Sequence, residues 1–93
     1  MNTTTITGAI HTIFPHEKYG DFRKRVFWVK EVNVKHPNIW SLEAWHDDTD
    51  NLDKLKGYVG EVSCEVTIRG KMYSKNGRDG IINTLHCTGI KKI

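Results

Sequence analysis

Tryptophan and cationic side chains are the residues of this sequence whose types and spacing are best suited to chemistry with a ligand. Three tryptophans occur in 93 residues, and one of them, Trp28, stands between Lys24 and Lys30. Exposed aromatic rings stack on planar groups such as nucleic-acid bases, while Lys and Arg neutralise phosphates. This combination predicts a ligand that offers both flat rings and negative charge.

The cations gather in two parts of the chain, at residues 18–25 and 69–78, whereas carboxylates gather at 47–53. The net charge is only +3 and the isoelectric point is about 9.0, so the position of the charge matters more than its total. The candidate binding residues are Trp28, Trp45, Lys24, Arg25, Lys30, Arg23, Arg69, Lys71, Tyr73 and Arg78.

Motifs for catalysis are not recognisable in the sequence. It has no G-x-S-x-G, no phosphate-binding loop of the Walker type and no H-E-x-x-H. His46-Asp47-Asp48 lies at one junction, and the other histidines have no ligand spacing. We therefore expect no enzymatic activity, no metal and no cofactor. Cys64 and Cys87 are expected to be free thiols that pack as small apolar groups.

A period of two dominates the hydrophobic pattern and predicts a largely β protein. The expected strands are 3–14, 23–34, 39–46, 61–73 and 81–90, with one short helix near 48–56 between the third and fourth strands. Gly8 interrupts the first strand, as at a bend or a close approach of backbones. Asn76-Gly77 is a strong signal for a hairpin turn. The length fits a single domain, 1–93.

The alternation also predicts which side chains face the core. Residues 62, 64, 66 and 68 should be buried, and residues 63, 65, 67 and 69 largely exposed or packed at an interface. In the third strand, Trp40, Leu42 and Ala44 form the apolar set, which leaves Trp45 on the outer face. An exposed tryptophan suggests that something covers it.

The expected order, β-β-β-α-β-β, is that of the five-stranded OB-fold barrel, an all-β fold here with one short helix. Another small five-stranded barrel is the alternative. Oligonucleotides bind OB-folds across the second and third strands, between the loop after the first strand and the loop joining the fourth and fifth.

Three segments resemble the bacterial and phage single-stranded DNA-binding proteins. They are the opening Ile6-Thr7-Gly8-Ala9-Ile10, the stretch 39–71 with its aromatic strand end, leucine pair and Lys56-Gly57, and the closing hairpin. The primosomal replication protein of this fold is about as similar. The resemblance implies that Phe27 and Val29 point inward and Trp28 outward; a shift of one residue would reverse this.

The resemblance, with the aromatic and cationic residues, predicts sequence-tolerant binding of a single-stranded nucleic acid, with DNA preferred to RNA and RNA left open, in replication, recombination or repair. The alternative is an OB-fold module that binds another protein through its exposed aromatics. We also expect a homo-oligomer, a dimer or tetramer, because small binders gain avidity by association. The sequence has no apolar run long enough for a membrane span, and few cysteines, so a cytoplasmic location is expected.

Overall fold

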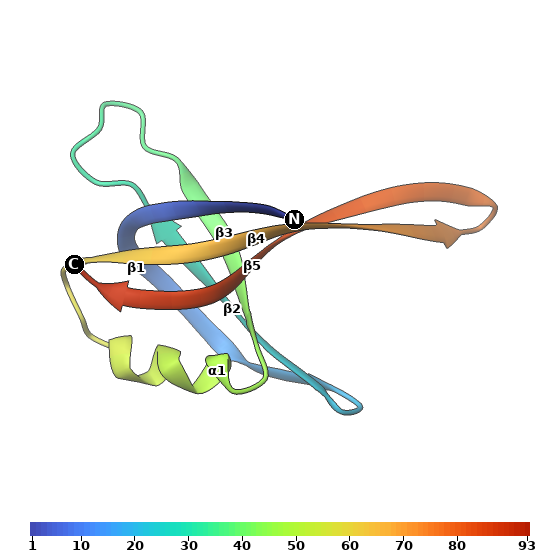
Figure 1. Ribbon diagram of the computed structural model, residues 1–93, viewed down its shortest axis with the longest axis horizontal. Helices are drawn as coiled ribbons and strands as arrows, with labels where there is room; N and C mark the ends of the chain where they lie inside the picture. The colour runs from blue at the N-terminus through green and yellow to red at the C-terminus, as the bar shows by residue number, and fades with distance from the viewer.

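A closed barrel of five strands forms the body of the protein (Figure 1). The computed structural model describes residues 1–93. The strands are β1 (Asn2–Tyr19), β2 (Phe22–Lys30), β3 (Ile39–Trp45), β4 (Glu61–Lys75) and β5 (Arg78–Lys92). Their order around the barrel is β1-β2-β3-β5-β4. A short helix, α1 (Asp48–Asn51), continues as a 3-10 turn, η1 (Leu52–Leu55), between β3 and β4. The predicted OB-fold order is thus confirmed. Neither helical segment is long and apolar enough to cross a membrane.

β1 closes the barrel by pairing with two strands in succession. Residues 2–9 pair with β4, and from Ala9 onward the strand pairs with β2. Gly8 lies at this change of partner, where an added Cβ would overlap the carbonyl oxygen of Lys30. The close approach predicted from the mid-strand glycine is therefore confirmed.

Two predicted strand boundaries are wrong. The first strand does not stop at residue 14 but continues to Tyr19, because an irregularity between Ile13 and His16 absorbs Phe14 and Pro15. A proline lacks the N–H that a sheet needs, and an irregular, unpaired position removes that need. The second strand ends at Lys30 rather than at residue 34, and residues 31–38 form an irregular connection.

The core is built from the inward-facing residues of the strands together with the helical segment. Eleven apolar residues are buried: Ile6, Phe27, Val29, Leu42, Ala44, Leu52, Leu55, Val62, Cys64, Val66 and Cys87. Phe27 and Val29 are fully buried, as the resemblance implied, and Trp40 is half-buried against the core. The parity expected for the second and third strands is thus confirmed, including the outward position of Trp28 and Trp45.

The alternation predicted for the fourth strand is present only in the part of β4 that belongs to the barrel. Val62, Cys64 and Val66 are buried, but Ile68 is 43% exposed and Thr67 only 5% exposed. Thr67 is covered because its strand lies between Thr3 of β1 and His86 of β5. Ile68 is open because β1 ends opposite it, at Asn2.

Beyond this point β4 and β5 continue together as a two-stranded hairpin, which we call the arm (residues 69–84). Its turn is Asn76-Gly77, both with positive φ, as the sequence predicted. In Figure 1 the arm and the β1–β2 hairpin both project to the same side of the barrel.

Candidate nucleic-acid interface

Trp45 is the centre of an aromatic and cationic cluster at the end of β3. Its ring stacks on His86 of β5, with ring centroids 3.7 Å apart and an angle of 18° between the planes. Phe22 of β2 meets the same ring edge-on at 5.3 Å. The guanidinium carbon of Arg69 lies 5.0 Å from the centre of the Trp45 ring. Three strands and the arm thus hold one half-buried indole in place.

His86 connects this cluster to the arm. Its Nδ1 accepts a hydrogen bond from Nε of Arg69 at 3.1 Å, which requires the neutral ring. Burial of the ring, and next the positive charge of Arg69, lower the pKa of His86. The imidazole therefore remains neutral near pH 7 and serves as a flat support for Trp45.

A carboxylate lies in the middle of this face. Glu43 accepts a hydrogen bond from Nε1 of Trp45 at 3.0 Å, and its other oxygen lies 3.7 Å from Nζ of Lys24. Lys24 also lies 5.7 Å from the centre of the Tyr19 ring. Glu43 orients the indole, but it also engages a cation that would otherwise be available to an anionic ligand.

Trp28 forms a second aromatic site on the same face of the sheet. It pairs with Ser41 of β3, while Lys24, four residues earlier on β2, pairs with Trp45. The two tryptophans are therefore separated by roughly 13 Å along the strand direction. Phe14 packs edge-on against Trp28 at 4.9 Å, beside an apolar hollow that includes Pro15 and Val26.

The arm extends this face with cations. In an antiparallel pair, directly opposite residues point to the same side. Arg69, Lys71, Tyr73 and Lys75 therefore share one side with their partners Thr84, Ile82, Gly80 and Arg78. All four cations are exposed, and the side chains of Lys71, Lys75 and Arg78 make no ion pair. The Tyr73 ring lies over Gly80, where the absence of a side chain leaves room for it.

Two of the predicted binding residues, Arg23 and Arg25, do not point to this face but contact the helical segment. Arg25 points inward and is 4% exposed; it donates to the carbonyl of Phe14 at 2.7 Å and to Asp53 at 2.8 Å. Arg23 has the same parity and lies within 3.7 Å of both Asp47 and Asp50. Both arginines join β2 to the helical segment. Lys30 is exposed at the far end of β2, on the side of Trp28.

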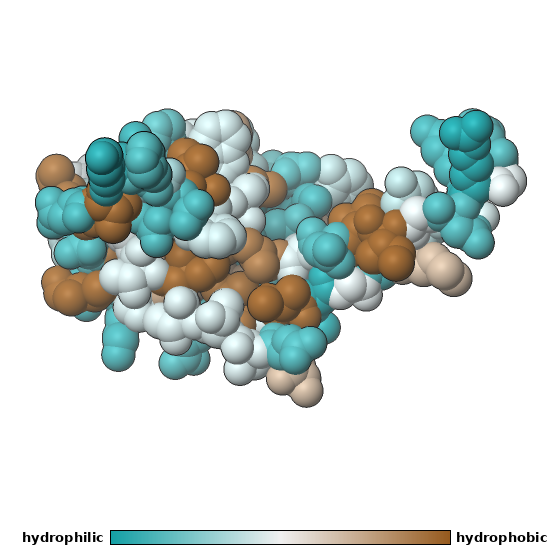
Figure 2. Space-filling view, turned by 90° about the horizontal axis from the view of Figure 1, so that it is seen from above, coloured by the Kyte–Doolittle hydropathy of each residue, from teal (hydrophilic) through white to brown (hydrophobic).

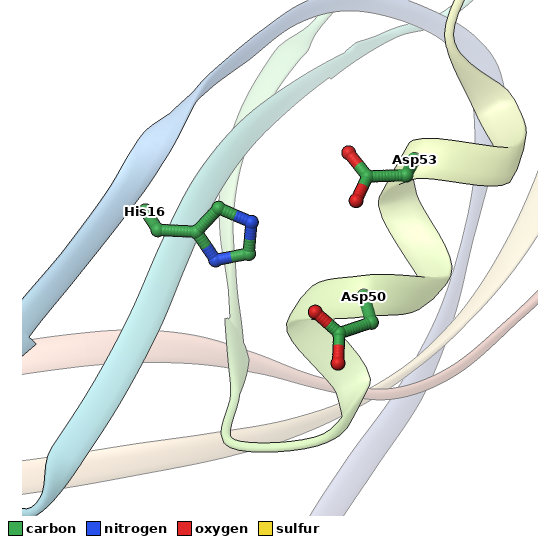
Figure 3. A group of neighbouring side chains, drawn as sticks. All are labelled: His16, Asp50 and Asp53. Atoms are coloured by element: carbon green, nitrogen blue, oxygen red, sulfur yellow. The ribbon is translucent and has the colours of Figure 1, made fainter.

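The helical segment also brings His16, Asp50 and Asp53 together (Figure 3). The sequence interpretation, in which the histidines had no ligand spacing, missed this proximity. The carboxylates are already partnered, however. Asp53 lies 2.8 Å from Arg25 and 3.4 Å from Lys56, and the hydrogen bond from Arg25 lowers its pKa. These contacts make the group an ion-pair network that fixes the helix.

The two cysteines lie on neighbouring strands in the core, both buried and both free. Cys64 pairs with Ile90, and Cys87 with Val66. A hydrogen bond with Cys87, followed by burial, raises the pKa of the Cys64 thiol. The expectation of free, buried thiols is confirmed, and Cys64 remains protonated and chemically quiet.

His86, Phe22 and Phe14 are the members of the site that sequence reasoning missed. His86 reaches Trp45 only because β5 lies parallel to β3 at a single pairing, Glu43 with His86. Phe14 reaches Trp28 because of the irregularity in β1. Neither arrangement has a local sequence signal.

No protein-family model matches the sequence, and no curated protein matches it. Solved structures do resemble it. The mitochondrial single-stranded DNA-binding protein Rim1 of S. cerevisiae has a TM-score of 0.72 and 14% identity, covering 99% of this chain and 94% of that one. The second single-stranded DNA-binding protein of Mycobacterium smegmatis has a TM-score of 0.65 and 15% identity, covering 97% and 86%.

A small single-stranded DNA-binding protein of Mycoplasma pneumoniae has a TM-score of 0.56 and 11% identity, covering 99% of this chain and 93% of that one. At these identities, the likeness shows that the chain has the OB-fold of these proteins.

Proposed function

We propose that this protein binds single-stranded DNA without strong sequence preference and without catalysing a reaction. The observation that carries the proposal is the placement of Trp28 and Trp45 on one face of β2 and β3, continuous with the unpaired cations of the arm. This is the surface on which OB-folds bind oligonucleotides. The solved structures that share the fold are named as single-stranded DNA-binding proteins, which supports the same ligand.

Each part of the face has a distinct physical task. The two indoles are far enough apart to stack separate bases, and stacking tolerates any sequence because every base has a flat face. Lys71, Lys75 and Arg78 neutralise phosphates that continue along the arm. Tyr73 offers a third ring between them. A single OB-fold engages roughly 4–16 nucleotides in this manner.

The finer parts of the proposal follow from the same reasoning. We propose a role in replication, recombination or repair, where single strands are exposed, and action as a homo-oligomer. DNA is preferred over RNA on the basis of the relatives' printed ligands. The cytoplasmic location remains a prediction from the sequence.

The test is a titration of dye-labelled oligo-dT, followed by fluorescence anisotropy at two or more salt concentrations. Wild type should bind, and log K should fall linearly with log salt. Trp28→Ala should weaken binding by about 1–3 kcal/mol, the value of one stacked base, with an unchanged salt slope. Lys71→Ala should reduce the slope by about 0.7, the value for one phosphate contact on a single strand.

Lys91→Ala is the matched control for Lys71→Ala. Lys91 is also an exposed strand lysine, but it pairs with Ser63 near the other end of β5. This variant should bind like wild type. If wild type shows no salt-dependent binding to any single strand, the proposal fails, and the protein-binding alternative replaces it because an aromatic protein interface responds far less to salt.

A further inference from the structure

Apolar side chains are exposed on the body of the barrel as well as along the arm (Figure 2). One hollow of the surface is walled almost entirely by apolar atoms, and we call it the Trp28 hollow. It is lined by residues of β1 and β2: Phe14, Pro15, His16, Glu17, Val26 and Trp28. Its volume is about 400 Å³, within the roughly 300–1,000 Å³ of small-molecule sites. The hollow therefore has room for a group of the size of a nucleobase.

The hollow is a consequence of the irregularity in β1. Phe14 and Pro15 have no partner on β2, and Val26 has none on β1. Instead of pairing, Phe14 packs edge-on against Trp28 at 4.9 Å, and Val26 remains half-buried beside them. The gap in the strand pairing thus leaves a space between apolar side chains on the outer face of the sheet.

The hollow adjoins the face on which the proposed function places a DNA strand. Trp28 belongs both to that face and to the wall of the hollow. Val26 pairs with Glu43 of β3, in the row between those of Trp28 and Trp45. A strand that stacks bases on both indoles therefore passes the opening of the hollow.

The charges around the hollow favour a base over a phosphate. Glu17 is the acidic residue of the lining, and one of its oxygens accepts a hydrogen bond from the Tyr19 hydroxyl at 2.5 Å. Lys24, which pairs with Glu17, lies 3.7 Å from Glu43. The ring of His16 is directed to the carboxylates of the helical segment (Figure 3). A carboxylate repels a phosphate, but it can accept an N–H at the edge of a base.

We propose that the Trp28 hollow takes one thymine base of the bound strand and contacts its 5-methyl group. The inference rests on the proposed function and names the base that the site prefers. Apolar contact is the way in which proteins recognise the thymine methyl group. Thymine also carries a ring N–H, for which Glu17 is an acceptor. Because uracil lacks the methyl group, the hollow gives this chain a modest preference for DNA over RNA, compatible with sequence-tolerant binding.

Oligo-dT and oligo-dU of equal length isolate the contribution of the methyl group, because their sugars and charges are the same. Each is used unlabelled to compete with dye-labelled oligo-dT, and fluorescence anisotropy reports the displacement. Wild type should bind oligo-dT about fourfold more tightly than oligo-dU, the factor for burial of one methyl-sized group. The salt slopes for the two oligonucleotides should be equal, because the phosphate contacts are the same.

Val26→Thr tests the hollow itself. Threonine retains the β-branched shape that suits a strand, but it places a hydroxyl group in the apolar wall. The preference for oligo-dT should fall below about twofold, with little change in the affinity for oligo-dU. Pro15→Ser should act in the same direction. Val59→Thr is the matched control, since Val59 is 91% exposed in the connection before β4, and it should retain the wild-type preference. Far-UV circular dichroism and thermal melting establish that each variant is folded.

Equal affinities of wild type for oligo-dT and oligo-dU would overturn this inference and leave the proposed function intact. A preference that persists in both Val26→Thr and Pro15→Ser would also overturn it, since the methyl group would then be recognised elsewhere on the face. If neither oligonucleotide competes and none binds with a dependence on salt, the proposed function fails, and the assignment of a base to the hollow fails with it. The two failures therefore give different results in the same assay.

Discussion

Glu43 gives the sharpest test of how the face is used, because it places a negative charge where a polyanion is proposed to bind. Its carboxylate accepts from Trp45 Nε1 and lies 3.7 Å from the Lys24 ammonium group. Both side chains of the Lys24–Glu43 pair are about three-quarters buried, with exposed fractions of 24% and 23%. The pair is thus shielded from salt more than a surface pair would be.

The informative change is Glu43→Gln. The amide oxygen can still accept from Trp45, so the indole retains its orientation, while the charge is removed and Lys24 is released. A phosphate near Lys24 lies on the order of 7 Å from the lost carboxylate, and at an intermediate dielectric this repulsion amounts to about 1 kcal/mol. Binding of oligo-dT should therefore tighten about fivefold. The salt slope should steepen by about 0.7, because Lys24 gains a phosphate.

Fluorescence anisotropy of labelled oligo-dT is the suitable assay, because tryptophan emission itself responds to the change beside Trp45. Glu61→Gln is the control with the same change in charge. Glu61 is also half-buried on a strand, but it lies eight residues before Arg69 on β4, or about 26 Å away. Unchanged affinity and slope in Glu43→Gln would refute the proposed path past Lys24. If Glu43→Gln and Glu61→Gln tightened binding equally, the effect would come from the change in net charge and not from the position of Glu43.

Three further predictions concern stability. Arg25→Met should lower the free energy of unfolding by about 2–4 kcal/mol, because it removes charged hydrogen bonds to Phe14 and Asp53; urea denaturation measures this, and a change in the DNA salt slope would argue against a purely structural role. His86 has a lowered pKa, so the unfolded chain binds its proton more tightly and stability should fall as the pH drops below about 6.5, towards the lower pKa of the folded state. Melting curves at several pH values should show a smaller loss in His86→Gln. Gly8→Ala should cost roughly 1–3 kcal/mol or more, since the new methyl group overlaps a backbone carbonyl; a melting temperature like that of wild type would disprove the close approach.

The fold was predictable because its signals are local. Alternation along 61–66 identified a strand with one buried face, and Asn76-Gly77 identified the hairpin turn. The change of period near Leu52 and Leu55 located the helical segment, and both leucines are buried. Each of these features depends only on neighbours within a few residues, which the sequence displays directly.

The site was predictable only in part, because it depends on contacts between distant residues. Trp28 and Trp45 were placed correctly by parity. The same parity places the Arg25 side chain inside the barrel. Because a buried arginine is rare unless it is paired, the basic run at residues 23–25 was interpreted as an exposed surface. Its partner, Asp53, lies 28 residues away on another element. Only the closed barrel brings that carboxylate within reach.

The inward position of Arg25 and the two sides of the arm have a common cause. A strand assigns its residues to two faces regardless of what those faces meet, and the surrounding elements decide whether a face is core, interface or solvent. The inward-facing side chains at the start of β2 lie beside a helical segment rich in carboxylates. Arg23 and Arg25 therefore form ion pairs that join β2 to this segment. The inward parity of β4 continues beyond the barrel, so Met72 is exposed. Cations on the outer parity remain unpaired on the arm, and this is where a phosphate backbone can be neutralised without breaking an existing ion pair.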